Sequence, residues 1–63
     1  MDIATTNEGN IVTVRPTSPR GKAWLDENVE AAPWQWLGDV LCVDHALAGD
    51  LIAGMRADGL TVG

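Results

Sequence analysis

Apolar residues are concentrated in the second half of the chain, where their spacing changes from continuous to helical. Val40–Val43 is an uninterrupted apolar run, so Asp39–Val43 is predicted to be the central strand of a sheet. Asp44 follows as a helix cap, and beyond it apolar residues recur with helical spacing: Leu47, Leu51 and Met55, flanked by Ala48 and Ile52. This pattern predicts an amphipathic helix over His45–Asp58.

The end of this helix has the residues of a glycine-terminated cap. Gly59 stands where a left-handed residue is expected, and Leu60 can fold back on Met55. Leu60–Val62 is then predicted to form a short strand. If that strand pairs in parallel with Val40–Val43, the crossover between them must be right-handed.

The first half of the chain is predicted to contain one strand, which a second strand can join in a hairpin. Ile11–Arg15 is rich in β-branched residues, which favour strands, and Pro16 ends it. Met1–Asn10 is polar, and it either frays or supplies a first hairpin strand. In the second case Ile3–Thr6 pairs with Ile11–Arg15 through the turn residues 7–10.

A second helix is predicted over Pro19–Asn28. Ser18 can cap it, and Pro19 suits the first helical position because its missing N–H would have no partner there. Asn28 is a plausible left-handed residue at the end. The apolar face of this helix consists of Trp24, Leu25 and Val29, with Gly21 one turn earlier.

The segment Ala31–Leu37 is interpreted as a connection that ends at Gly38. Pro33 can open a single helical turn carrying Trp34 and Trp36. These two indoles are two residues apart, so they cannot share one face. We expect one of them to lie in the core and the other to be partly exposed.

Together these elements predict an α+β fold, with two helices packed on a small sheet of three or four strands. The 63 residues fit a single small domain. Repeats, low-complexity tracts and interdomain linkers are absent from the sequence. So small a chain also has no room for a separate catalytic cleft of ordinary size, about 300 Å³ or more.

Charge adds a second kind of information. Nine acids face four bases, for a net charge of −5, which argues against direct binding to nucleic acid or to an anionic membrane. From Asp26 to Asp58 the chain has seven acids and one base, Arg56, so this segment has a net charge of −6 (−7 + 1). It is either a solubilising surface or a face that meets a Lys/Arg-rich partner.

Cys42 and His45 are three positions apart and raise the question of a nucleophile–base pair. We favour a structural interpretation, because Cys42 lies in an apolar strand, where a free cysteine packs as a small hydrophobe. His45 lies beyond the strand–helix junction with only Asp44 as an orienting group. The sequence shows neither the ligand spacing of a zinc site nor a phosphate-binding glycine loop. We therefore predict a non-enzymatic protein with no cofactor and no metal.

The sequence predicts a cytoplasmic protein that contacts no membrane. The first ten residues lack the basic and apolar segments of a signal peptide. The lone Cys42 allows no intramolecular disulfide, and the longest apolar run, Val40–Val43, is far too short to span a bilayer.

In its size, its acidity and its lack of signature motifs, the whole chain resembles the small inhibitors carried by phages and mobile elements. Anti-CRISPR proteins that act on type I systems are the group in question, and some of them act as DNA mimics on basic channels. The resemblance implies a protein–protein inhibitor whose acidic surface blocks a nucleic-acid-binding site on a CRISPR effector complex in the host cytoplasm. It carries over no family residue by position.

For that function we expect the partner to be a basic protein surface, met by exposed acids and by one indole as an anchor. The predicted partner-binding residues are Asp26, Glu27, Glu30, Asp39, Asp44, Asp50 and Trp34.

The alternative is a small dimeric regulatory or antitoxin-like accessory protein. The back of the predicted helix His45–Asp58 carries small residues that would let a second helix approach closely: Ala46, Gly49, Ala53 and Ala57. Alanine is also a good helix former on any exposed surface. The sequence is therefore compatible with a monomer or a homodimer.

Overall fold

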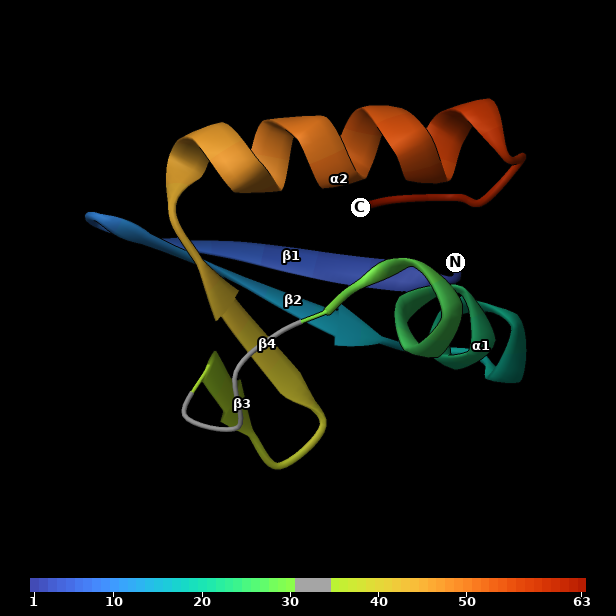
Figure 1. The fold of residues 1–63 in the computed structure, drawn as a ribbon, viewed down its shortest axis with the longest axis horizontal. Coiled ribbons are helices and arrows are strands. Elements are labelled where there is room, and N and C mark those ends of the chain that lie inside the picture. Colours follow the sequence, from blue (N-terminus) through green and yellow to red (C-terminus); the bar gives the residue numbers. More distant parts are fainter. Residues whose placement is uncertain (31–34) are drawn as a thin grey trace.

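The structure is a computed structural model that describes residues 1–30 and 35–63, and it contains a four-stranded sheet and two helices (Figure 1). The elements are β1 Ile3–Glu8, β2 Ile11–Pro16, α1 Pro19–Asn28, β3 Trp36–Leu37, β4 Val40–Val43 and α2 His45–Ala57. The strand order is β1-β2-β4-β3, and all neighbouring strands are antiparallel. The predicted α+β class is confirmed, with four strands in the sheet.

Two tight hairpins build this sheet. In the first, Glu8 lies opposite Ile11, and in the second, Leu37 lies opposite Val40. Each two-residue loop begins with a glycine of positive φ, 75° at Gly9 and 63° at Gly38. Such glycines are typical of the loop types whose twist matches that of the strands.

The first hairpin has the pairing predicted for Ile3–Thr6 with Ile11–Arg15, although β1 continues to Glu8. The second hairpin was not predicted, because Trp36–Leu37 was taken as part of a connection. A strand of two residues is too short to show alternation in the sequence. The helical turn predicted to open at Pro33 is wrong at Trp36, which lies in β3. Gln35 is in a 3₁₀ turn, and residues 33 and 34 lie outside the described residues.

Helix α1 has the predicted bounds and the predicted cap, since the Ser18 hydroxyl accepts a hydrogen bond from the Gly21 N–H at 3.0 Å. Its C-terminal end differs from the prediction. Asn28 is still helical, and the cap residue is Val29, which has an extended φ of −117°. The Asn28 side-chain amide donates to the Trp24 carbonyl at 3.0 Å, so a left-handed residue is not required there.

Helix α2 begins and ends as its local residues predict. Asp44 caps it, with its carboxylate accepting from the Leu47 N–H at 2.7 Å. At the other end Gly59 has a φ of 86°, and the Leu60 N–H donates to the Met55 carbonyl at 2.9 Å. This is the hydrogen-bond pattern of a glycine-terminated Schellman cap.

One hydrophobic core lies between the two helices and one face of the sheet. Its buried side chains are Ile3, Val12, Val14, Trp24, Leu25, Leu41, Val43, Ala48, Met55 and Leu60. The predicted inner row of α2 is wrong at Leu47, whose exposed fraction is 40%. The helix instead turns Ala48, Leu51 and Met55 toward the core.

The C-terminal segment lies beside β1 rather than beside β4. Val62 forms an isolated parallel bridge with Ile3, so the predicted strand over Leu60–Val62 is wrong, and this segment does not take up the possible pairing with Val40–Val43. The reason is that β2 and β3 already occupy both edges of β4. Figure 1 shows the two chain ends close together on the side of β1.

The other face of the sheet, here called the open face, carries the alternate side chains of all four strands. Because residues opposite each other in the register share a face, these are Ala4, Thr6, Glu8, Ile11, Thr13, Arg15, Leu37, Val40 and Cys42. Each of these side chains is exposed or half-buried. In β4 only the side bearing Leu41 and Val43 is buried.

Candidate protein-binding groove

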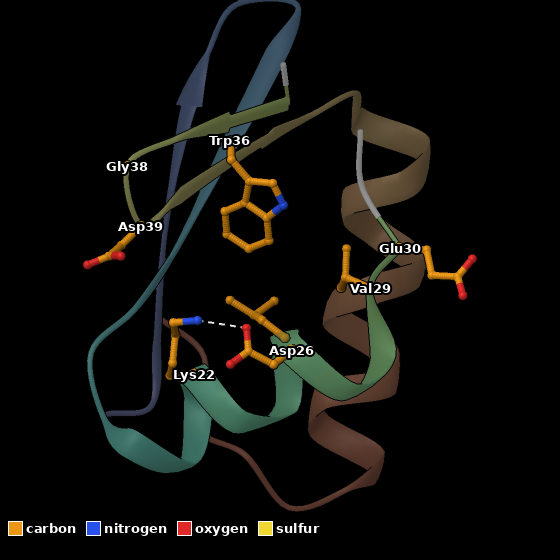
Figure 2. Close-up of a pocket in the computed structure, with 8 residues that line it drawn as sticks. Lys22, Asp26, Val29, Glu30, Trp36, Gly38 and Asp39 are labelled. Carbon is orange, nitrogen blue, oxygen red and sulfur yellow. Dashed lines mark hydrogen bonds and ion pairs between the residues drawn. The ribbon is translucent and has the colours of Figure 1, made fainter. Parts of the chain in front are cut away.

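A cavity of about 470 Å³ lies between α1 and the β3–β4 hairpin, and we call it the acidic groove. The expectation that so small a chain has no room for a cleft of about 300 Å³ or more is therefore wrong. Its lining residues are Lys22, Leu25, Asp26, Val29, Glu30, Trp36, Gly38 and Asp39. Figure 2 shows the indole of Trp36 reaching from β3 toward α1, above Lys22 and Asp26. The groove therefore has an aromatic and aliphatic floor with charged groups around it.

The positions of these side chains follow from the elements that carry them. Lys22 and Asp26 are four residues apart on one side of α1, whereas Glu30 follows the extended cap residue Val29, beyond the end of the helix. Trp36 lies opposite Leu41 in the register, so it shares the inner face of the sheet with that buried residue. The turn at Gly38 then places Asp39 at the rim of the groove.

Three carboxylates and one ammonium group give this groove its negative charge. Lys22 Nζ and Asp26 Oδ1 are 2.7 Å apart, and their side chains are 48% and 57% exposed. An exposed pair four residues apart on a helix contributes only about 0.3–0.5 kcal/mol, so a competing cation can replace Lys22. In Figure 2 the carboxylates of Glu30 and Asp39 point away from Trp36 toward solvent.

This arrangement suits a cationic side chain better than it suits a reaction. A guanidinium or ammonium group over an indole face gains about 0.5–2 kcal/mol, depending on its desolvation. A carboxylate at the side of the ring adds a charge-assisted hydrogen bond, which is bidentate for arginine. Trp36 and Asp26 are placed to supply these two contacts.

The structure brings together three of the predicted partner-binding residues, Asp26, Glu30 and Asp39. Glu27 is exposed on α1 without lining the groove, and Asp50 is exposed on α2. Asp44 is the N-cap of α2, which gives this carboxylate a structural role. Trp34 lies outside the described residues, so its predicted role as an anchor remains a prediction.

Trp36 is the residue of the groove that the sequence-based selection missed. It is half-buried and packs against the core while its ring lines the cavity. The signal was present in the sequence: a two-residue turn at Gly38-Asp39 places Trp36 opposite Leu41, in the middle of the apolar strand.

Cys42 and His45 lie in different surroundings. His45 Nε2 lies 2.6 Å from the Gly9 carbonyl oxygen, which can only accept, so the ring N–H donates to it. Cys42 belongs to the open face of β4. Within residues 1–30 and 35–63, the His, Cys, Asp and Glu side chains form no group of three or more that could hold a metal ion.

Of the helices in the described part of the chain, neither combines the length and the apolar character needed to cross a membrane.

The chain was compared with known protein families, curated proteins and solved structures. No protein-family model matches the chain, and neither a curated protein nor a solved structure shows significant similarity to it.

Proposed function

We propose that this protein is a non-enzymatic inhibitor that binds a basic surface of a partner protein through the acidic groove. The observation that carries the proposal is that Asp26 and the half-buried indole of Trp36 line one cavity, with the carboxylates of Glu30 and Asp39 at its rim. An arginine or lysine of the partner enters the groove, lies against Trp36 and replaces Lys22 as the partner of Asp26.

The remaining exposed acids act over a longer range. Glu27 and Asp50 lie outside the groove. They contribute to the net charge of −5 of the whole chain, which attracts a basic surface toward the molecule. Long-range attraction of this kind raises the rate of association and weakens with added salt. The groove then fixes the orientation of the bound partner.

A basic surface that accepts such a protein is typically built for the phosphate backbone of a nucleic acid. By occupying it, the protein acts as a DNA mimic and inhibits the partner in the host cytoplasm. The resemblance to anti-CRISPR proteins makes the effector complexes of type I CRISPR systems the first partners to test.

The experiment measures binding to purified type I effector complexes, with target DNA as competitor. We expect DNA to displace the protein, and the double variant Glu30→Lys with Asp39→Lys to lose at least 30-fold in affinity. The matched control is Glu27→Lys with Asp50→Lys, which makes the same change of net charge outside the groove and should cost less than about 5-fold at 150 mM salt.

Equal losses in the two double variants would show that only net charge matters and would remove the groove from the mechanism. Binding that is insensitive to charge reversal at Asp26, Glu27 and Glu30 would reject an acidic interface altogether. Trp36→Leu, checked for folding by circular dichroism, should weaken binding about 10-fold because it removes the ring that contacts the cation.

A further inference from the structure

The open face carries little charge for so acidic a molecule. Its only acidic or basic residues are Glu8 and Arg15, whose formal charges cancel, whereas the whole chain has a net charge of −5. Leu37 is 74% exposed and Ile11 is 40% exposed on it. Val40, Cys42 and Thr13 fill the space between them, so the apolar surface continues from β3 across β4 to β2.

A sheet face that is meant for water usually alternates polar side chains with the buried ones. The open face departs from that pattern, because most of its positions are apolar or threonine. Contiguous exposed apolar patches on small proteins mark interaction surfaces. The low charge of this face also removes the repulsion that two acidic copies would otherwise experience on contact.

The edges of the sheet offer less than its face does. Residues 61–63 already bond to one edge, since the Thr61 carbonyl accepts from the Ile3 N–H at 3.1 Å and the Gly63 N–H donates to the Ile3 carbonyl at 2.9 Å. The opposite edge is β3, which is only two residues long. Extension of the sheet by a strand of another chain is therefore restricted at both sides.

The two charges lie at opposite ends of the open face. Glu8 is opposite Ile11 at the turn end of the first hairpin, and Arg15 is opposite Ala4 near the other end. The two cross-strand pairs are separated by four residues along each strand, or about 14 Å. Two aligned sheets pack about 10 Å apart, a gap that glutamate and arginine side chains can bridge together.

We propose that the open face packs against the open face of a second copy of this chain. In this dimer each strand runs antiparallel to the same strand of the other copy. A two-fold axis perpendicular to the strands brings Glu8 of each copy to the end that carries the partner's Arg15, and two ion pairs form. An axis along the strands would bring like charges together at both ends. The charge pattern thus selects one of the two aligned arrangements.

The size of the face sets the strength of this dimer. Strands of at most six residues and four strands in width give no more than about 400 Å² per copy. A standard interface buries about 800 Å² per partner, so we expect a weak, transient dimer. Two copies also present two acidic grooves, but the association does not depend on what those grooves bind.

The experiment is sedimentation equilibrium of the full chain from 5 μM to 1 mM at 50 mM salt. We expect a monomer–dimer equilibrium for the wild type and at least 10-fold weaker association for Glu8→Arg and for Arg15→Glu, each alone. An equimolar mixture of the two variants should associate again at wild-type strength. In the mixed dimer one copy contributes two basic groups and the other two acidic groups, so both ion pairs form.

The control is Ala53→Glu, which places a charge on the exposed small-residue side of α2 and should leave the association unchanged. A monomer at 1 mM, equal association of all variants, or loss of the dimer in Ala53→Glu alone would overturn the proposal. Cys42 gives a second readout, because it is the single cysteine and lies on the open face. Its rate of reaction with a maleimide should fall as the protein concentration passes the Kd, and a constant rate contradicts this interface.

Discussion

Asp2 connects three segments that are far apart in the sequence. Its carboxylate accepts a hydrogen bond from the Ser18 hydroxyl at 2.6 Å and another from the Thr61 N–H at 3.0 Å. Its backbone carbonyl accepts from the Thr17 N–H at 2.8 Å. The hydrogen bond from Ser18, followed by that from Thr61, holds the pKa of Asp2 below its ordinary value of 3.8.

This lowered pKa predicts an acid-sensitive contribution to stability. Because Asp2 releases its proton more easily in the folded state, its contribution is complete above about pH 5 and is lost as the pH falls through 3.8 and then through the lower folded pKa. We expect the free energy of unfolding to fall more steeply between pH 5 and pH 2 in the wild type than in Asp2→Asn. Urea denaturation at several pH values measures both slopes, and equal slopes would contradict the assignment.

At the scale of single elements, the two helices contain glycines that look alike in the sequence and differ in their surroundings. A Cβ on Gly21 of α1 would collide with the backbone carbonyl oxygen of Asp2. A Cβ on Gly49 of α2 would meet nothing within 4 Å. Gly21 is therefore needed for the close contact of α1 with the N-terminal segment, whereas Gly49 only weakens its helix.

The matched substitutions should have opposite signs. Gly49→Ala should stabilise the protein by about 0.5–1 kcal/mol through helix propensity. Gly21→Ala should destabilise it by about 1–3 kcal/mol, because the clash with fixed backbone exceeds the same gain in propensity. Thermal or urea denaturation of both variants tests this, and stabilisation by Gly21→Ala would show that α1 can move away from Asp2 at little cost.

The elements that the sequence predicted well are those whose ends are set by their own residues. Ser18-Pro19, Asp44 and Gly59 each act within one turn of a helix, so both helices were placed to within one residue. β3 was missed because its two residues become a strand only by pairing with β4. Asn28 was assigned a left-handed conformation because a side-chain bond to the helix carbonyl cannot be recognised from residue type.

The same distinction applies to the candidate groove. Asp26 could be placed beside Lys22 from their spacing on α1, whereas Glu30 lies beyond the helix, after the extended Val29. Asp39 joins them only because the β3–β4 hairpin packs near α1, which is a property of the assembled fold. The choice of Trp36 over Trp34 could not be made from the spacing of the two indoles, and it needed the Gly38-Asp39 turn to be recognised as a hairpin loop.

At the scale of the whole molecule, negative charge is poorly balanced. Among the residues that the structure describes, one ion pair is present, Lys22 with Asp26, in a chain of net charge −5. Repulsion between like charges then outweighs attraction, and mobile ions should weaken it.

We therefore expect added salt to stabilise this protein. Raising NaCl from 10 to 200 mM should increase the Tm by about 2–5 °C. Lys22→Gln removes the ion pair and changes the net charge from −5 to −6, so its increase should be larger. Differential scanning calorimetry measures both, and a Tm that falls with salt would mean that attractive pairs dominate.

The parallel pairing of residues 61–63 with β1 also determines how the molecule responds to force. The Asp2 and Ile3 N–H groups both donate to the Thr61 carbonyl, and the Thr5 N–H donates to the Gly63 carbonyl at 2.8 Å. When residues 1 and 63 are pulled apart, two parallel segments slide past each other, and these bonds are loaded in shear at the same moment. Pulling on an antiparallel hairpin would open its bonds one after another. The molecule should therefore be mechanically stiff along this one direction, since all of these contacts must break in a single step before the rest of the sheet can extend.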